Sequence, residues 1–481
     1  MTQIIKRRTK TTMSDLWIDI TALYWLVIKI TLYASALIIL ISGIDDSFFD
    51  IYYWIHKWSK KKSTRPVDIN LTNQINELEE KPIAVMIPAW QEWPVIDKMA
   101  KRAASTFDYQ LYHIFIGTYP NDELTQEAVD LVVATYPNVH KVVTDKPGPT
   151  TKADCLNNVI KSIQKFEKDQ FISFEIIAYH DAEDVTHPLE LKLYNFFIPE
   201  NDLIQLPVFP LARSWKHFTG NHYMDEFGEV HIKDMLVREA MTGNVPSAGV
   251  GTAFSRKAIN YLHDKNKGVV FATDSLTEDY EIAYELTKQG MKEKFVLFPI
   301  ENSTPPYVSV KGFFPAKLGA AIRQKSRWII GIVFQARKKI GWPPLSPLFY
   351  VLLRDRKALI TVPTMLLAYF VFVNVVIMEI YTRSSSDTWW FPSLVPLDSW
   401  IWPILYMNGF FMINRLYHRF HSTSHLYGFK EGLLSVPRTV VGNIINIGAF
   451  FRALKQVFSA QQTGKKLSWD KTDHEFPDDD H

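Results

Sequence analysis

The chain has 481 residues, enough for one large domain with appended helices or for two or three smaller domains. Its 53 Lys and Arg residues nearly balance its 51 Asp and Glu residues, so the net charge of +2 gives no indication of a nucleic-acid partner. The single cysteine, Cys155, excludes an internal disulfide framework and a cysteine-based zinc cluster. Aromatic residues make up 14% of the chain and often flank long apolar runs, which is typical of membrane contact.

The first long apolar run, residues 20–44, is interrupted only by Lys29 and is long enough to cross a hydrocarbon core of roughly 30 Å. No small-residue cleavage site follows it, so we expect residues 1–62 to form an uncleaved membrane anchor. The polar stretch 63–80 is expected to be a linker that leads to a folded domain.

Residues 81–310 are expected to form an α/β domain. Apolar runs of strand length at 81–89 and 112–117 enclose a helical pattern at 96–105, which predicts a βαβ unit and a parallel sheet. Two further strands are predicted at 139–144 and 175–179, each followed by polar residues. Because ligands of open α/β sheets bind at the carboxyl ends of the strands, we expect the site at that edge.

The remainder of the chain is expected to contact the membrane. Its parts are interfacial helices at 311–345, a region 346–416 with crossings at about 358–378 and 399–414, and a C-terminal region 417–481 with a surface helix at 439–451. Basic residues from Lys57 to Arg65 follow the first crossing, whereas the loop 379–398 holds only Arg383, so the positive-inside rule places the middle region in the cytoplasm. The basic residues before the first crossing argue for the opposite orientation.

Five short motifs follow one another in the middle of the chain. They are PAWQE (88–92), TTKAD (150–154), HDAED (180–184), TED (277–279) and QKSRW (324–328). Any one of them alone is weak evidence, because charged residues after a strand usually form a solvated turn. The ordered set predicts a membrane-bound glycosyltransferase that uses a nucleotide sugar.

Asp181 and Glu183 of HDAED are the predicted metal ligands. A sugar nucleotide carries a diphosphate whose charge must be neutralised as it leaves, and carboxylates at a strand end can do this by holding Mg²⁺ or Mn²⁺. Asp184 could be a third ligand or a hydrogen-bond acceptor behind the first two, and both readings stay open.

Asp279 of TED, with Glu278 beside it, is the predicted general base. Transfer to a hydroxyl acceptor with inversion needs a carboxylate within hydrogen-bond reach of that hydroxyl. The alternative is an ordinary helix start, with Thr277 as a capping residue before an acidic first turn. The position of TED between HDAED and QKSRW favours the base.

QKSRW places Gln324, Arg327 and Trp328 on about one helical turn, so that they can face one site. A guanidinium suits a diphosphate and a large aromatic ring suits the face of a sugar. An interfacial helix with Trp and Arg at the lipid headgroups is the alternative, and both can hold at once.

The donor nucleotide is expected near the polar residues that follow the first strands, Glu92, Asp122, Lys152 and Asp154, although each could be an ordinary surface charge. The segment AGVGTAF at 248–254 offers Gly251 and Thr252 as acceptor contacts, because glycine allows a close approach of the backbone. A plain turn is the alternative.

These motifs resemble the processive family 2 glycosyltransferases, the group of cellulose, hyaluronan and related synthases. More closely, HDAEDVTHPLELKLYNFF, DKPGPTTKADCLN and the tail GKKLSWDKTDHEFP resemble the bacteriophage adsorption protein B branch, an inner-membrane glycosyltransferase. The resemblance extends from Ser14 to Pro477. It implies a GT-A-like fold, which is a Rossmann-type mixed sheet, with a UDP-sugar donor, a divalent metal and an acceptor end near the membrane.

Position by position, the resemblance implies nucleotide contacts from Glu92, Asp122 and Lys152 or Asp154, metal and diphosphate contacts from Asp181 and Glu183, a base at Asp279, and contacts to donor diphosphate and acceptor sugar from Gln324, Arg327 and Trp328. Glu183 stands where synthases usually carry Asp, which leaves the ligand geometry open. Relatives in this branch often continue after WDKT into a domain that binds cyclic di-GMP. This sequence ends at His481 after an acidic DDD, so whether that nucleotide regulates the chain directly stays open.

We therefore expect an inverting glycosyltransferase of the bacterial inner membrane that transfers a sugar, for which the branch suggests an N-acetylhexosamine, to a growing exopolysaccharide or cell-surface glycan. The expected partners are the UDP-sugar, a glycan or lipid-linked acceptor, membrane lipids and an export partner in the periplasm or outer membrane, with a role in phage adsorption. The alternatives are transfer to a lipid-linked acceptor without export, a non-catalytic scaffold or receptor subunit, and a metal-dependent phosphotransferase or nucleotidyltransferase.

Overall fold

The computed structural model describes residues 13–61, 69–301, 303–384, 393–464 and 474–477. The chain divides into two compact units. The helical unit comprises residues 1–48 and 358–415, and the α/β unit comprises residues 49–357 and 416–481. Helices α1 (Met13–Lys61) and α15 (Trp402–Tyr427) contribute residues to both units.

A seven-stranded mixed sheet forms the centre of the α/β unit. In spatial order its strands are β3 (Val139–Val143), β2 (Tyr112–Thr118), β1 (Ile83–Pro88), β4 (Ile176–Tyr179), β7 (Thr252–Ser255), β5 (Leu203–Gln205) and β8 (Glu293–Phe295). The first four strands are parallel, and β7 runs antiparallel to both of its neighbours. A two-stranded sheet pairs β6 (Val208–Pro210) with β9 (Val310–Gly312).

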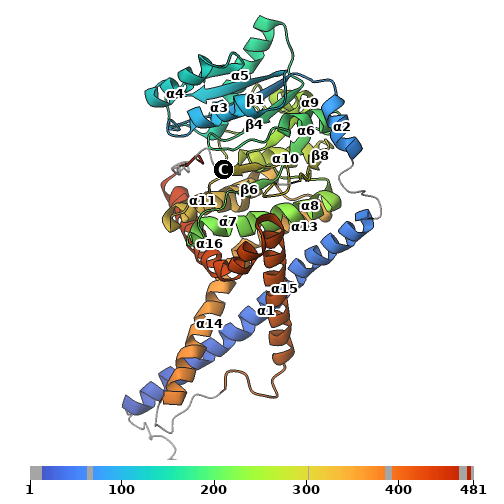
Figure 1. Cartoon of the computed structure of the whole chain (residues 1–481). Helices are drawn as coiled ribbons and strands as arrows, with labels where there is room; N and C mark the ends of the chain where they lie inside the picture. The colour runs from blue at the N-terminus through green and yellow to red at the C-terminus, as the bar shows by residue number, and fades with distance from the viewer. Residues whose placement is uncertain (1–12, 62–68, 302, 385–392, 465–473, 478–481) are drawn as a thin grey trace, which may run out of the picture. The chain divides into compact units, whose positions relative to one another are not determined.

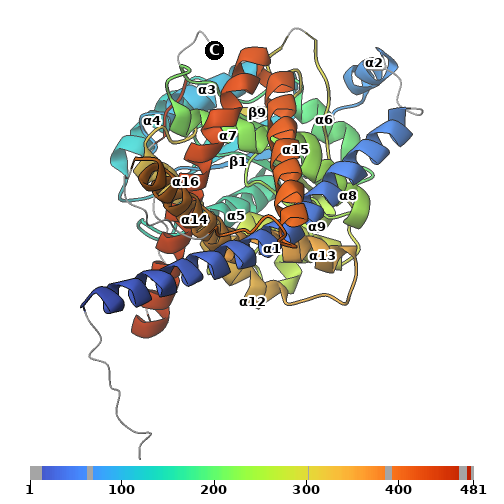
Figure 2. The same ribbon diagram turned by 90° about the horizontal axis from the view of Figure 1, so that it is seen from below.

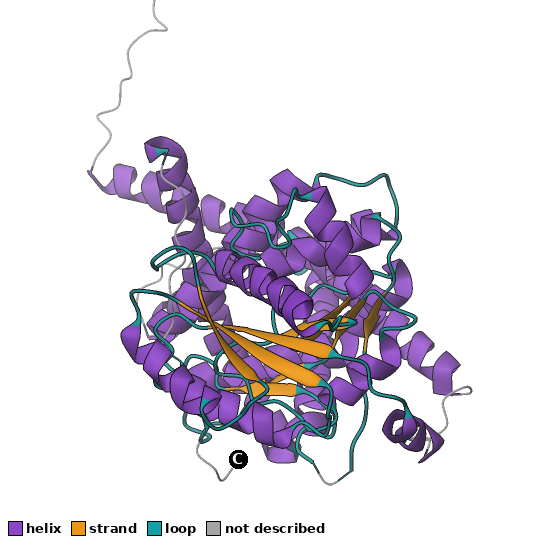
Figure 3. Ribbon diagram, turned by 90° about the horizontal axis from the view of Figure 1, so that it is seen from above, coloured by secondary structure: helices purple, strands orange, loops and turns teal. Residues whose placement is uncertain are grey.

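Helices cover both faces of the large sheet, which explains why its inner strands are continuous apolar runs (Figure 3). In β1, Ile83, Val85 and Ile87 point to one core, and Ala84 and Met86 point to the other. The first core is closed by α3 (Ile96–Thr106), α4 (Glu123–Val133) and α6 (Glu190–Phe197). The second is closed by α5 (Lys152–Gln170), α9 (Arg256–Lys265) and α10 (Glu278–Lys288). A short helix, α2 (Ile69–Glu77), precedes β1.

Further helices of the α/β unit follow the small sheet strands in sequence. They are α7 (Phe218–Glu229), η1 (Val230–Asp234), α8 (Met235–Thr242), α11 (Leu318–Trp328), η2 (Ile329–Gln335), α12 (Ala336–Ile340), α13 (Pro347–Asp355) and α16 (Phe429–Thr463). η1 and η2 are π-helical turns that continue directly into α8 and α12. Helix α7 packs against both α11 and α16.

Three acidic residues of α7 each pair with a base from a different helix. Asp225 holds Arg438 of α16 through two hydrogen bonds of 2.7 and 2.8 Å, and both side chains are buried. Glu226 pairs with Lys325 of α11, and Glu229 pairs with Arg419 of α15 at 3.2 Å. We call Asp225, Glu226 and Glu229 the α7 acidic row. Because burial strengthens both the attraction of such pairs and the cost of breaking them, the row fixes how these helices meet.

Arg438→Met is expected to destabilise the protein by about 3–5 kcal/mol, because it leaves the Asp225 carboxylate buried without its strongest partner. Lys430→Met, at an exposed position of the same helix, should change stability by less than about 0.5 kcal/mol. Denaturant unfolding of both variants in detergent measures the difference. Equal stabilities would show that the buried pair contributes nothing.

Three helices among the described residues are long and apolar enough to cross a membrane: residues Asp19–Ser59 of α1, α14 (Ala358–Ser384) and α16. Within the helical unit, two tyrosines of α1 form hydrogen bonds with polar side chains further along the chain. Tyr24 donates to Asn374, and Tyr33 shares a hydrogen bond of 2.8 Å with Ser399. Figure 1 draws α1 and α14 as long helices, and they have 49 and 27 residues. The mixed α/β sheet and these apolar helices confirm the predicted fold class.

The predicted crossings at 20–44 and 358–378 lie within two of the three candidate helices. The predicted crossing at 399–414 lies in α15, which is not among them, and the run at 439–451, expected at the surface, lies in α16, which is. The domain boundaries and the assignment of each helix as crossing or interfacial stay predictions. The linker prediction for 63–80 falls partly on residues 62–68, outside the described chain.

Candidate active site

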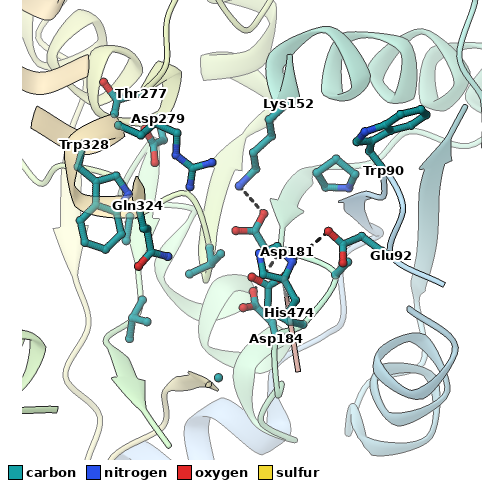
Figure 4. Close-up of a pocket in the computed structure, with 18 of the residues that line it drawn as sticks. Trp90, Glu92, Lys152, Asp181, Asp184, Thr277, Asp279, Gln324, Trp328 and His474 are labelled. Carbon is teal, nitrogen blue, oxygen red and sulfur yellow. Dashed lines mark hydrogen bonds and ion pairs between the residues drawn. The ribbon is translucent and has the colours of Figure 1, made fainter. Parts of the chain in front are cut away.

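One pocket of the α/β unit is lined by residues from all five motifs (Figure 4). It lies where β1 and β4 end, because PAWQE begins at the last residue of β1 and HDAED directly follows β4. The predicted site residues in its lining are Glu92, Lys152, Asp181, Glu183, Glu278, Asp279, Gln324, Arg327 and Trp328. The pocket therefore brings together predicted residues that lie as far apart in the sequence as Glu92 and Trp328.

Asp181 and Glu183 point into this pocket, and each has a basic counterpart. The ammonium of Lys152 lies 2.5 Å from Asp181, and the imidazole Nδ1 of His474 lies 3.1 Å from Glu183. Carboxylate oxygens are the ligands that hard divalent cations prefer, so the two side chains fit such a cation in kind. Among the described residues, no three His, Cys, Asp or Glu side chains are grouped as a metal-ligand set.

Asp184 also lines the pocket, and its carboxylate contacts neighbouring groups of the same loop. Its Oδ2 accepts a hydrogen bond of 3.0 Å from the backbone N–H of Asp181 and lies 3.0 Å from Nδ1 of His180. His180 is fully buried and its Nε2 lies 2.6 Å from Glu190. Burial opposes a charge on His180, but Glu190 and Asp184 raise the pKa of the imidazole to about 10. These contacts favour Asp184 as the residue that orients the HDAED loop.

The TED segment forms the start of α10. Asp279 accepts a hydrogen bond of 2.8 Å from the backbone N–H of Tyr280, so the acidic first turn of the alternative reading is present. The capping threonine of that reading is not: the Thr277 side chain makes no capping hydrogen bond, and its buried Oγ1 has no hydrogen-bond partner among the described residues. Thr277 nevertheless contributes to the lining of the pocket.

Burial of several acids in one place raises their pKa values. Burial and the charge of Asp279 raise the pKa of Glu278 to about 7. Burial likewise raises the pKa of Asp279, although the nearby Lys152 ammonium opposes the shift. Burial raises the pKa of Glu183 to about 8 despite the attraction of His474. Acids with pKa values near neutrality are suited to proton transfer at physiological pH.

Two cations of the pocket come from TTKAD and QKSRW. Burial disfavours the charge of Lys152, but Asp181 and Glu278 raise the pKa of its ammonium overall. Lys152 also donates to the backbone carbonyl of Gly249 at 2.9 Å, which fixes the position of its ammonium. Burial lowers the pKa of Arg327 against the opposing pull of the pocket acids, and a guanidinium stays charged at any physiological pH.

Helix α11 divides its side chains between the pocket and the α7 acidic row. Gln324, Arg327 and Trp328 line the pocket, and the buried Oε1 of Gln324 has no hydrogen-bond partner among the described residues. Lys325 points to Glu226 and also donates to Asn446 of α16 at 3.0 Å. Gln324, Arg327 and Trp328 therefore lie at one site, as the sequence pattern predicts.

Four predicted residues do not line the pocket. Asp122 caps α4 and accepts a hydrogen bond of 2.5 Å from the backbone N–H of Gln91. Asp154 lies in the first turn of α5. Thr252 donates to Gln205 at 2.7 Å inside the sheet, and Gly251 has the positive φ of +58° that glycine favours. Asp122 can therefore act on the pocket only through the PAWQE loop.

Trp90 and His474 are among the pocket residues to which the sequence analysis assigned no role. Trp90 of PAWQE packs edge-on against Tyr119, with ring centroids 4.9 Å apart, and its ring occupies the space in which Gly148 would carry a side chain. His474 comes from the C-terminal tail, and its Nδ1 lies 3.0 Å from Glu92 as well as close to Glu183. The tail sequence indicates no role for His474 beyond its share in the family resemblance.

The tail residues 474–477 are held against the α/β unit at three points. His474 contacts Glu92 and Glu183, Glu475 lies 2.7 Å from Arg213, and Phe476 packs against the first core of the sheet. Burial opposes a charge on His474, but the charges of Glu183 and Glu92 raise the pKa of its imidazole to about 9. At neutral pH this side chain is therefore a cation beside the two carboxylates.

Comparison with known proteins matches residues 176–414 to a family model described as glycosyl transferase family group 2. The chain is 44% identical over 478 residues to bacteriophage adsorption protein B of Escherichia coli strain K12, and it has the same identity to bacteriophage N4 adsorption protein B of Escherichia coli O157:H7. The chain contains a family 2 glycosyltransferase domain. The matches cover 96% of this chain and 64% of each relative, so the chain spans less than two thirds of their length.

Two solved structures show a lower similarity to this chain. The mannosyltransferase PcManGT from Pyrobaculum calidifontis, in complex with GDP-Man and Mn²⁺, is 15% identical with a TM-score of 0.49, over 84% of this chain and 99% of that one. Glucosyl-3-phosphoglycerate synthase from Mycobacterium tuberculosis, in complex with Mn²⁺ and UDP, is 14% identical with a TM-score of 0.29, over 47% of this chain and 72% of that one. The family 2 domain confirms the resemblance drawn from the five motifs.

Proposed function

We propose that this chain is an inverting, metal-dependent glycosyltransferase that moves a sugar from a UDP-sugar to a growing glycan at the cytoplasmic face of the bacterial inner membrane. The observation that supports this most is the pocket in which the carboxylates of HDAED, the acid of TED and the three polar and aromatic residues of QKSRW meet. A phosphotransferase would need only the first of these groups.

The donor would lie between the PAWQE and TTKAD loops on one side and Arg327 on the other. Lys152 and Arg327 would compensate the negative charge of the diphosphate, and Arg327 can do so with two parallel hydrogen bonds. Asp181 and Glu183 would hold a Mg²⁺ or Mn²⁺ ion, which when bound neutralises the leaving diphosphate. Glu92, and Asp122 through its hold on the PAWQE loop, would position the nucleoside.

The transfer step would use Asp279 as the base. The acceptor hydroxyl oxygen attacks the anomeric carbon while its proton moves to the Asp279 carboxylate. The bond from that carbon to the diphosphate oxygen breaks, and the electron pair leaves with UDP. Attack from the face opposite the leaving group inverts the anomeric configuration. Gln324 Oε1, which has no hydrogen-bond partner among the described residues, would accept a hydrogen bond from a sugar hydroxyl, with the ring of Trp328 against a sugar face.

The acceptor is proposed to be a glycan whose end reaches the pocket from the membrane side. The candidate crossings α1 and α14 would anchor the chain in the inner membrane, and a partner in the periplasm or outer membrane would carry the product outward. The relatives are named for phage adsorption, so a surface glycan that phages recognise is a product consistent with them. The donor sugar is proposed to be an N-acetylhexosamine.

Purified full-length chain in detergent, incubated with a panel of UDP-sugars and Mg²⁺ or Mn²⁺, tests this function. Release of UDP with one donor, together with appearance of that sugar in an acid-stable glycan, is the expected result. If a folded protein released no UDP with any donor, we would conclude that the chain is a non-catalytic scaffold. If the labelled sugar appeared in a phosphorylated product, we would conclude that the chain is a phosphotransferase.

His474→Gln is expected to lower the half-saturating Mn²⁺ concentration about tenfold, because it removes a cation that competes for the charge of Glu183 and Glu92. Titration of UDP release with Mn²⁺ measures the effect. Glu475→Gln in the same tail segment keeps His474 and should leave the Mn²⁺ requirement unchanged. A higher Mn²⁺ requirement in His474→Gln would instead make the imidazole a support for metal binding.

A further inference from the structure

The helix that follows QKSRW holds the loop that leads into TED. After Trp328 the chain continues without a break through η2 and α12. Three of its residues, Gly331, Gln335 and Lys339, follow one another at intervals of four and contact the segment 274–281. We call these three residues the clip. Residues four apart lie on one face of a helix, so all three residues contact the loop from the same face.

Gly331 makes the closest of these contacts. A side chain at this position would collide with Oγ1 and Cγ2 of Thr277 and lie 2.8 Å from its Cβ. Only the absence of a side chain therefore lets the backbone of η2 pack directly on Thr277. Because packed interiors do not yield by such an amount without cost, any larger residue must displace Thr277 or the helix.

Gln335 and Lys339 hold the loop on the two sides of this contact. Oε1 of Gln335 accepts a hydrogen bond of 2.9 Å from the backbone N–H of Leu276. Lys339 lies 2.5 Å from Asp274 and 3.2 Å from Glu281. The Lys339 pairs are partly exposed and contribute little by themselves. The amide contact is the informative one, because it fixes the backbone one residue before TED.

The loop is also braced from within. Ser275 donates to Glu281 at 2.6 Å and accepts from the backbone N–H of Thr277 at 3.2 Å. Beyond it, Tyr280 and Tyr284 of α10 pack with Ile340 of α12 and Leu352 of α13. Figure 2 shows α12 and α13 as neighbours on the underside of the α/β unit. These contacts therefore tie the position of the loop to the positions of α10 and the clip.

We propose that Gly331, Gln335 and Lys339 are positioning residues that set the distance between the Asp279 carboxylate and the QKSRW side chains. The same continuous helix carries Gln324 and Trp328 and then the clip, and the π-helical turn η2, which directly follows Trp328, contains Gly331 and Gln335. Such turns often occur at functional sites. The proposal rests on the proposed function, since it concerns the step in which Asp279 takes a proton. None of the three residues contacts the reacting atoms.

Gly331→Ala tests the proposal by pushing on Thr277. We expect kcat for sugar transfer to fall about 10²-fold, as misplacement of a reacting group by about 1 Å produces, while KM for the UDP-sugar changes less than about twofold. Thr277→Ala removes both the Oγ1 and the Cγ2 that the new methyl group would meet, so the double variant Gly331→Ala/Thr277→Ala should recover kcat relative to Gly331→Ala. If Gly331→Ala lowered the thermal stability but left kcat unchanged, the clip would contribute only to packing, and the proposal would be overturned.

Gln335 provides a second, independent test. Gln335→Met keeps the side-chain length but loses the acceptor for Leu276, and should lower kcat at unchanged KM. Gln335→Glu keeps an acceptor oxygen and should retain most of kcat. Lys338→Met, at an exposed position of the same helix, is the matched control. Equal kcat in Gln335→Met and Lys338→Met would also overturn the proposal, whereas an inactive wild-type chain would instead refute the proposed function on which it rests.

Discussion

Asp279→Asn is expected to lower kcat for sugar transfer by about 10³-fold or more, at the upper part of the range for loss of a general base. The amide keeps the size of the side chain but cannot take the proton of the acceptor hydroxyl. Binding of the UDP-sugar should persist, because Lys152, Arg327 and the HDAED carboxylates remain. Release of UDP and incorporation of labelled sugar into glycan both measure the loss.

Glu285→Gln is the control for this variant, because Glu285 belongs to the same helix and pairs with Lys265 outside the pocket. It should keep nearly full activity. If Asp279→Asn transferred sugar as fast as Glu285→Gln, Asp279 would not be the base, and Glu278 would be the next candidate on the same turn.

The pH dependence of kcat should reveal the same carboxylate. Burial raises the pKa of Asp279, so its proton-accepting form is lost at a higher pH than for an ordinary aspartate. Activity should therefore fall as the pH is lowered, with a limb that lies above pH 4. A limb at the usual aspartate pKa in the wild type would mean that Asp279 is solvated during the reaction.

Asp181→Asn is expected to lower kcat/KM by about 10²–10³-fold and to weaken the response to Mn²⁺. The carboxylate is the proposed link between metal and diphosphate, and its loss also leaves the Lys152 ammonium without its 2.5 Å partner. The measurement is UDP release as a function of Mn²⁺ concentration. Full wild-type activity in the presence of a chelator would contradict the metal proposal at once.

Asp145→Asn serves as the matched control, since Asp145 is an exposed acid near the same edge of the sheet and pairs only weakly with Lys161. Its Mn²⁺ titration should overlay that of the wild type. Comparison of the two Asp→Asn variants separates a specific ligand from the general effect of removing one negative charge.

The sheet and the motif positions could be predicted because strand patterns and strand ends are local signals. The runs at 81–89 and 112–117 became β1 and β2, and the residues after β4 entered the pocket as the rule for parallel strands requires. Glu183, the departure from the usual motif, lies in the pocket beside Asp181.

The same rule could not separate ligand contacts from capping residues. Asp122 and Asp154 follow strands just as Asp181 does, but one caps α4 and the other begins α5, and short polar residues serve all three purposes. Thr252 and Gly251 likewise serve the sheet interior and its turn. Distinguishing these roles requires knowing which way each side chain points.

Local sequence patterns could not predict the position of His474 or the extent of α16. No spacing rule tells which surface a tail covers when its contacts, such as that with Glu92, lie 382 residues away. In α16 the apolar run at 439–451 is only part of a helix of 35 residues. The full length could not be predicted, because buried polar side chains such as Ser435 and Arg438 interrupt the apolar pattern.

The α7 acidic row has a consequence for biosynthesis. Asp225 and Glu229 leave the ribosome long before the bases that neutralise them, since Arg419 and Arg438 lie 190 and 213 residues further along the chain. Glu229 meets a nearer base at once, because Lys233 lies four residues further along the chain. The hydrogen bonds of Asp225, in contrast, go to Thr423 of α15 and Arg438 of α16. The packing of α7 with α11 and α16 is therefore completed only after α16 has been translated, so a chain still being synthesised does not yet hold the finished pocket.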